Sequence, residues 1–133
     1  MSTLPSSKPW LASYAPGVRP EVEVPKEDIG LALERSIAAF GDRTALDFMG
    51  SSLTYAELGD RVTRAAGMLS AQGVKHGDRV AIAMPNAITH VVAFYAVLRL
   101  GAIVVEHDPL YTRSELVHQR NDSGATLAVF WDK

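Results

Sequence analysis

The stretch "RVAIAM", residues 79–84, decides the fold class, because a short apolar run of this kind is typical of a strand buried on both faces. Pro85 ends the run, and we expect Asn86 to cap a helix that ends at Gly101. Two further strand-like runs follow, "AIVVE" (102–106) and "TLAVFW" (126–131), with one helical stretch before each. Strands separated by single helices imply right-handed crossovers and a parallel sheet. The sequence therefore predicts an α/β fold.

The N-terminal residues 1–27 form a different kind of segment. They hold five of the seven prolines, and proline fixes φ and lacks an N–H donor, so we expect an extended, irregular arm. The side chains of Trp10, Leu11 and Tyr14 are expected to pin this arm onto a surface. Residues 28–133 are then predicted to form the first part of a larger domain, with a partial, doubly wound, Rossmann-like sheet and flanking helices.

Between the arm and the sheet, the sequence predicts a helix, a β-hairpin and a second helix. Apolar residues recur at helical spacing over 29–40 and Gly41 follows, while "TALDF" and "SLTY" flank the turn "MGSS". Thr54 and Glu57 have capping-box spacing, and an apolar stripe runs behind them to a helix end at Gly73. A second capping box, Thr112 and Glu115, predicts a helix that ends at Gly124.

Composition excludes several classes of function. The 133 residues carry a formal net charge of −2 with no basic run, so nucleic-acid binding lacks its electrostatic signature. The absence of cysteine excludes disulfides and thiolate sites, and it fits a cytoplasmic location. The most apolar window, 88–105, contains His90, Arg99 and Gly101, which argues against a membrane span and leaves peripheral membrane contact open.

One acid–base trio, Glu106, His107 and Asp108 in "IVVEHDPLYT" (103–112), lies where ligands bind in open parallel sheets. Side chains alternate along a strand, so Glu106 and Asp108 should share one face while His107 points to the other. Neighbours so arranged cannot converge on one ion or one proton. Asp108 before Pro109 is also a common way to open a turn. We therefore interpret the trio as the polar end of a buried strand, and His118 does not extend it into a motif.

The sequence argues against two kinds of phosphate site. The dinucleotide-binding fingerprint needs glycines after the first buried strand, but this chain reads "PNAITH" there. The glycine-containing stretch "GVKHGDR" lies before that strand instead of after it, so we interpret Gly73 and Gly77 as turn residues. A phosphate-receiver domain could use Asp108 and Lys133, but its Mg²⁺-binding acidic pair is replaced by Met84, Pro85 and Asn86. Phe94 and Tyr95 are interpreted as core residues. The sequence thus predicts no catalytic, cofactor-binding or metal-ligating residue in this chain.

Five segments, in order, resemble the N-terminal part of the adenylate-forming enzymes, the AMP-forming acyl-CoA synthetases. They span about residues 30–128 and read "ERSIAAFGDRTAL", "LTYAEL", "GVKHGDRVAIAMPN", "AFYAVLRLGAIVV" and "DPLYTRSELVHQRNDSGAT". The arm "PWLASYAPGV" and the phrase "PLYT" resemble those of long-chain fatty acid–CoA ligases. Medium-chain and coumarate-type members are the alternatives within the family.

This resemblance implies a parent enzyme that uses ATP, Mg²⁺, coenzyme A and a fatty acid. It places the trio at a structural strand-to-helix junction, where many relatives carry Asn in place of Asp108. It also places every catalytic motif beyond Lys133, so we expect this chain alone to be inactive and to self-associate through open sheet edges. The alternative from another class is a stand-alone, non-catalytic α/β interaction module.

Overall fold

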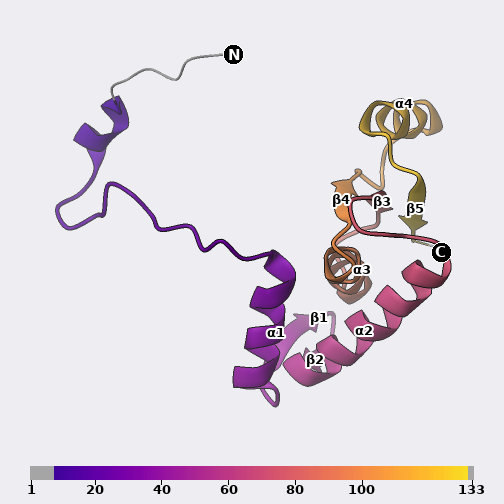
Figure 1. Ribbon diagram of the computed structural model, residues 1–133, viewed down its shortest axis with the longest axis horizontal. Coiled ribbons are helices and arrows are strands. Elements are labelled where there is room, and N and C mark those ends of the chain that lie inside the picture. The colour runs from indigo at the N-terminus through magenta and orange to yellow at the C-terminus, as the bar shows by residue number, and fades with distance from the viewer. Residues whose placement is uncertain (1–7, 132–133) are drawn as a thin grey trace.

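A computed structural model describes residues 8–131 of the chain (Figure 1). Three parallel strands form one sheet, in which β3 (Arg79–Ala83) lies between β4 (Ile103–Glu106) and β5 (Leu127–Phe130). The helix α3 (Ile88–Arg99) connects β3 to β4, and α4 (Arg113–Ser123) connects β4 to β5. The α/β fold with a parallel sheet is therefore confirmed.

The main core lies on the α3 side of this sheet. Val80 and Ile82 of β3 are both 0% exposed and pack against Ala93 and Val97 of α3. The opposite face of β3 presents Ala81 toward α4, and Figure 1 shows α3 and α4 on opposite sides of the strands. The middle strand is thus buried on both faces, as its apolar sequence predicts.

A second core joins the N-terminal elements to the sheet layer. Leu33 of α1 (Ile29–Phe40) packs with Leu58 and Val62 of α2 (Tyr55–Ala71), and the ring of Tyr95 on α3 lies against this group. The predicted hairpin forms from β1 (Thr44–Phe48) and β2 (Ser51–Thr54), which pair antiparallel. Because α2 contacts α1 and α3, it connects the two cores.

Both capping boxes form as predicted. Thr54 and Glu57 exchange hydrogen bonds at the start of α2, and Thr112 and Glu115 do the same at the start of α4. The backbone N–H and hydroxyl of Thr54 donate to Glu57 and hold the pKa of its carboxyl below the usual value. The Thr112 hydroxyl and N–H likewise lower the pKa of Glu115. These caps fix where the two helices begin.

One detail of the sequence prediction is wrong, and a second has a different physical cause. The N-cap of α3 is Ala87 without a side-chain hydrogen bond, because the helix begins at Ile88 and Asn86 lies one residue too early. The glycine at the end of α1, Gly41, keeps a right-handed conformation, so no left-handed cap requires it there.

Across residues 8–131, no helix is both long and apolar enough to cross a membrane.

The arm is also not pinned as predicted. Trp10 lies in a short 3-10 helix (Pro9–Ser13) and is 49% exposed, and Tyr14 just after it is 42% exposed. Figure 1 shows that the arm extends outward from the start of α1, away from the sheet and the other helices. Within the arm, Lys8 pairs with Glu21 at 2.5 Å. Both aromatic side chains are therefore exposed and do not pin the arm onto the folded elements.

Two glycine substitutions test whether a glycine after a helix is required by the backbone, whereas a glycine inside a helix is not. Gly101 follows α3 with φ +67°, and a Cβ there would lie 2.4 Å from the His76 ring, so Gly101→Ala should destabilise the chain by about 1–2 kcal/mol. Gly67 lies in α2 with open space around it, so Gly67→Ala should stabilise by about 1 kcal/mol. Denaturant unfolding measures both, and equal effects at the two sites would contradict the account.

Candidate functional site

The carboxyl ends of the three parallel strands meet at one edge of the sheet, which is where ligands bind in open α/β folds. Residues 84–86 follow β3, and Trp131 follows β5. Of the trio, Glu106 is the last residue of β4, and His107 and Asp108 come directly after it. This edge is therefore the first place to look for a site.

The three trio side chains separate at this edge. Glu106 points toward α3, where its Oε1 lies 3.0 Å from His90 Nε2. His107 points toward α4, where its Nδ1 lies 2.9 Å from Gln119 Oε1. Asp108 lies outside the strand, and its Oδ1 accepts a 2.9 Å hydrogen bond from the Leu110 N–H. The expectation that Glu106 and His107 occupy opposite faces is confirmed, and the trio does not converge.

The His90–Glu106 contact is the feature that sequence reasoning missed. The His90 ring lies between two acceptors, because its Nδ1 is also 3.3 Å from the Met84 carbonyl oxygen. It therefore ties the ends of β3 and β4 to the first turn of α3. No local signal could have revealed it, since His90 and Glu106 are 16 residues apart and come together only through the parallel crossover.

A hollow of about 450 Å³ lies beside this contact. It is lined by Asn86, His90, Phe94, Tyr95 and Glu106, together with Ala87 and Val91. Phe94 and Tyr95 also pack against the two cores, and their rings meet edge to face with centroids 5.4 Å apart. Their interpretation as core residues is thus confirmed, although both also line the hollow.

The residues at this edge do not fit a nucleotide phosphate or a divalent cation. Within residues 8–131, no group of three or more His, Asp or Glu side chains is placed to hold a metal ion. The turn after β3 offers Met84, Pro85 and Asn86, without the glycines that bring backbone N–H groups onto a phosphate. Lys133, the partner considered for Asp108 in a phosphate receiver, lies outside the described residues.

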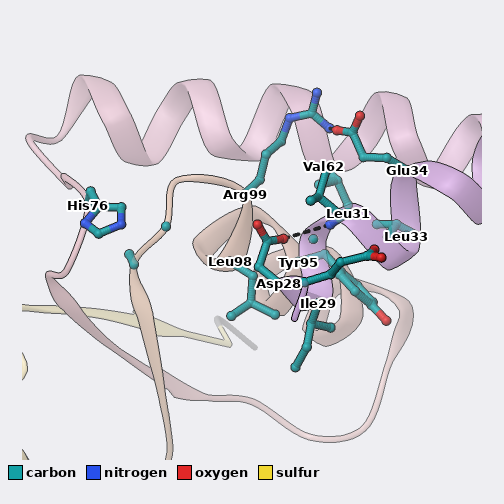
Figure 2. Close-up of a pocket in the computed structure, with 14 residues that line it drawn as sticks. Asp28, Ile29, Leu31, Leu33, Glu34, Val62, His76, Tyr95, Leu98 and Arg99 are labelled. Atoms are coloured by element: carbon teal, nitrogen blue, oxygen red, sulfur yellow. Dashed lines mark hydrogen bonds and ion pairs between the residues drawn. The ribbon is translucent and has the colours of Figure 1, made fainter. Parts of the chain in front are cut away.

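A larger groove, of about 660 Å³, runs between the start of α1, the end of α3 and His76 (Figure 2). Three of its charged side chains already make contacts that hold helices in place. Asp28 Oδ1 accepts from the Leu31 N–H at 2.8 Å, and Arg99 pairs with Glu34 at 2.7 Å. These contacts cap α1 and join it to α3, so they account for the groove as a packing seam between helices.

Comparison with known proteins places this arrangement in a family. A family model described as AMP-binding enzyme matches residues 33–132, most of the chain. The chain belongs to the AMP-binding enzyme family. The family resemblance drawn from the five ordered segments is therefore confirmed.

Curated members of the AMP-binding family include relatives that are much longer than this chain. The long-chain-fatty-acid–CoA ligase of Bacillus subtilis (strain 168) is 37% identical over 127 residues, which cover 96% of this chain and 23% of that protein. The ligase of the same name from Escherichia coli O6:H1 is 40% identical over 124 residues, which cover 92% of this chain and 22% of that protein. The chain thus spans less than a quarter of the length of either relative.

Solved structures of the AMP-binding family share the fold. O-succinylbenzoate Coenzyme A synthetase from Bacillus subtilis, solved in complex with AMP, superposes with a TM-score of 0.73 at 27% identity. The match covers 80% of this chain and 28% of that chain. The parallel sheet with its hairpin therefore corresponds to part of the fold of these enzymes.

The structural role of Asp108 can be tested with two substitutions. Asp108→Asn keeps an oxygen that can accept from the Leu110 N–H, so the free energy of unfolding should change by less than about 0.5 kcal/mol. Asp108→Ala removes that acceptor and should lower it by about 1 kcal/mol. Denaturant unfolding of the two variants measures the difference. An Asn variant as unstable as the Ala variant would show that the carboxylate charge, and not the turn, matters.

Proposed function

We propose that this chain is the N-terminal scaffold of an ATP-dependent, AMP-forming long-chain fatty acid–CoA ligase. The observation that carries the proposal is the extent of the likeness. Identity of 37–40% to ligases of that name runs over more than nine-tenths of the chain, so it includes most of the N-terminal arm as well as the sheet. The segments "PWLASYAPGV" and "PLYT" support the long-chain subclass in particular.

The proposed reaction has two steps. A carboxylate oxygen of the fatty acid attacks the α-phosphorus of ATP and releases pyrophosphate, which leaves an acyl-adenylate. The thiol of coenzyme A then attacks the acyl carbon and releases AMP, which leaves the thioester. Charge on the phosphates during the first step needs cationic groups, a metal such as Mg²⁺ or backbone donors around it.

The described residues of this chain do not supply those groups. The carboxyl edge of its sheet carries one His–Glu contact and a turn without glycine, which fit neither ATP nor Mg²⁺. We therefore assign ATP, Mg²⁺ and coenzyme A to parts of the enzyme other than this chain. The role proposed for residues 28–131 is to build the first strands and helices on which those parts pack, in a cytoplasmic enzyme.

ATP–pyrophosphate exchange tests the proposal. The full-length protein should exchange labelled pyrophosphate into ATP with long-chain fatty acids, and more slowly with short-chain and aromatic acids. The 133-residue chain alone, as the matched control, should show no exchange above buffer. No exchange by the full-length protein with any carboxylic acid would overturn the ligase assignment, and a preference for aromatic acids would overturn the long-chain subclass.

A further inference from the structure

The ring of His90 on α3 joins the ends of two neighbouring strands. Its Nδ1 lies 3.3 Å from the carbonyl oxygen of Met84, directly after β3, and its Nε2 lies 3.0 Å from Oε1 of Glu106, the last residue of β4. The side chain of His90 is 19% exposed and that of Glu106 is 47% exposed. All three residues belong to elements that pack on one another within residues 8–131, so both contacts are internal to this part of the fold.

The acceptors on the two sides of the ring fix the number of protons that these contacts need. A backbone carbonyl oxygen can only accept a hydrogen bond, so Nδ1 has to carry a proton to donate to Met84. A carboxylate can also only accept, so the contact with Glu106 needs a second proton, on Nε2 or on the carboxyl itself. The ring and the carboxyl therefore hold two protons together while both contacts stand, and they titrate as a pair.

Loss of one of these protons leaves one contact without a donor. A neutral imidazole has a single N–H, and an ionised carboxylate binds it more strongly than a carbonyl oxygen does. The proton then stays on Nε2 with Glu106, and the lone pair of Nδ1 faces the lone pairs of the Met84 carbonyl oxygen. This repulsion separates the ring from the end of β3.

The surroundings of the ring make Glu106 its main charged neighbour. The hollow beside the ring is also lined by the titratable side chain of Tyr95, whereas residues 84–86 carry no titratable side chain. Among residues 8–131, Glu106 is the only ionisable group within hydrogen-bonding distance of the ring. Other charged side chains that border α3 lie on its opposite face or at its far end: Arg61 and Arg64 of α2, and Arg99 with its partner Glu34 of α1.

We propose that His90 and Glu106 form a proton-dependent clamp that holds residues 84–86 against the first turn of α3. With two protons the clamp is closed, and with one proton it opens at Met84. The closed form binds one proton more than the open form, so lower pH favours closure. Histidine ordinarily changes its charge between about pH 5 and 8, so the clamp opens as the pH rises through this range. The clamp does not rest on the proposed ligase reaction, because it needs neither ATP nor a fatty acid.

Glu106→Gln distinguishes the clamp from a simple packing contact. The introduced amide has both a donor and an acceptor, so it can donate to Nε2 of a neutral ring while Nδ1–H still donates to Met84. This variant should keep both contacts at every pH. His90→Phe keeps an aromatic ring without a nitrogen, so it should lack both contacts at every pH. The matched control is His118→Gln, which changes an exposed histidine on α4 and should behave as the unmodified protein.

NMR of the full-length protein with ¹⁵N in its histidine rings reports the tautomer directly. His90→Phe assigns the signals of this ring by removing them. Once neutral, the ring of His90 should carry its proton on Nε2 in the unmodified protein and on Nδ1 in Glu106→Gln. Loss of packing alone would not move the proton from one nitrogen to the other. The same tautomer in both proteins would overturn the proposal.

Hydrogen exchange of the full-length protein, measured by mass spectrometry, tests the opening itself. The amides of His90 and Val91 donate to the Ala87 carbonyl oxygen in the turn that the ring anchors. After correction for the intrinsic effect of pH, their protection should fall by about threefold between about pH 5.5 and 8, the scale of a partly exposed ion pair. It should stay high at both pH values in Glu106→Gln and low at both in His90→Phe. An unmodified protein without this fall, or an equal fall in Glu106→Gln, would contradict the clamp.

Discussion

Burial of β3 between two parallel partners is the constraint on which the rest of the structure depends. Its residues Val80 and Ile82 have no exposed surface, because β4 and β5 cover its edges and α3 covers one face. A strand buried in this way must direct every N–H and C=O group into sheet hydrogen bonds, since an unpaired buried amide costs about 1–3 kcal/mol. The crossovers through α3 and α4 are what bring the two partners into place.

The other elements support that strand by packing outward from it. The helix α3 has one side in each core, through Val97 toward β3 and Tyr95 toward Leu33 and Val62. The capping boxes begin α2 and α4 at defined residues and so set the lengths of the connections. At the carboxyl edge, the polar residues Glu106, His107 and Asp108 make helix and turn contacts, which give each side chain of the trio a structural role.

Local patterns in the sequence predicted most of this fold, because they depend on neighbours in the chain. Apolar runs located β3, and capping-box spacing located the starts of α2 and α4. Contacts between distant segments could not be predicted in this way. The His90–Glu106 pair depends on a crossover, and the exposure of Trp10 depends on which surface the arm can reach. The Asn86 cap was wrong by one residue, which is the usual scale of error for a helix boundary.

Native-state hydrogen exchange tests most directly the claim that this chain is a scaffold built around β3. The slowest amides should be those of β3 and its ladder partners in β4 and β5, exchanging only on global unfolding, while amides of residues 19–27 should exchange as in an unprotected peptide. If β3 amides instead exchange as fast as those of the arm, the sheet is not a stable core in this chain and the account is wrong.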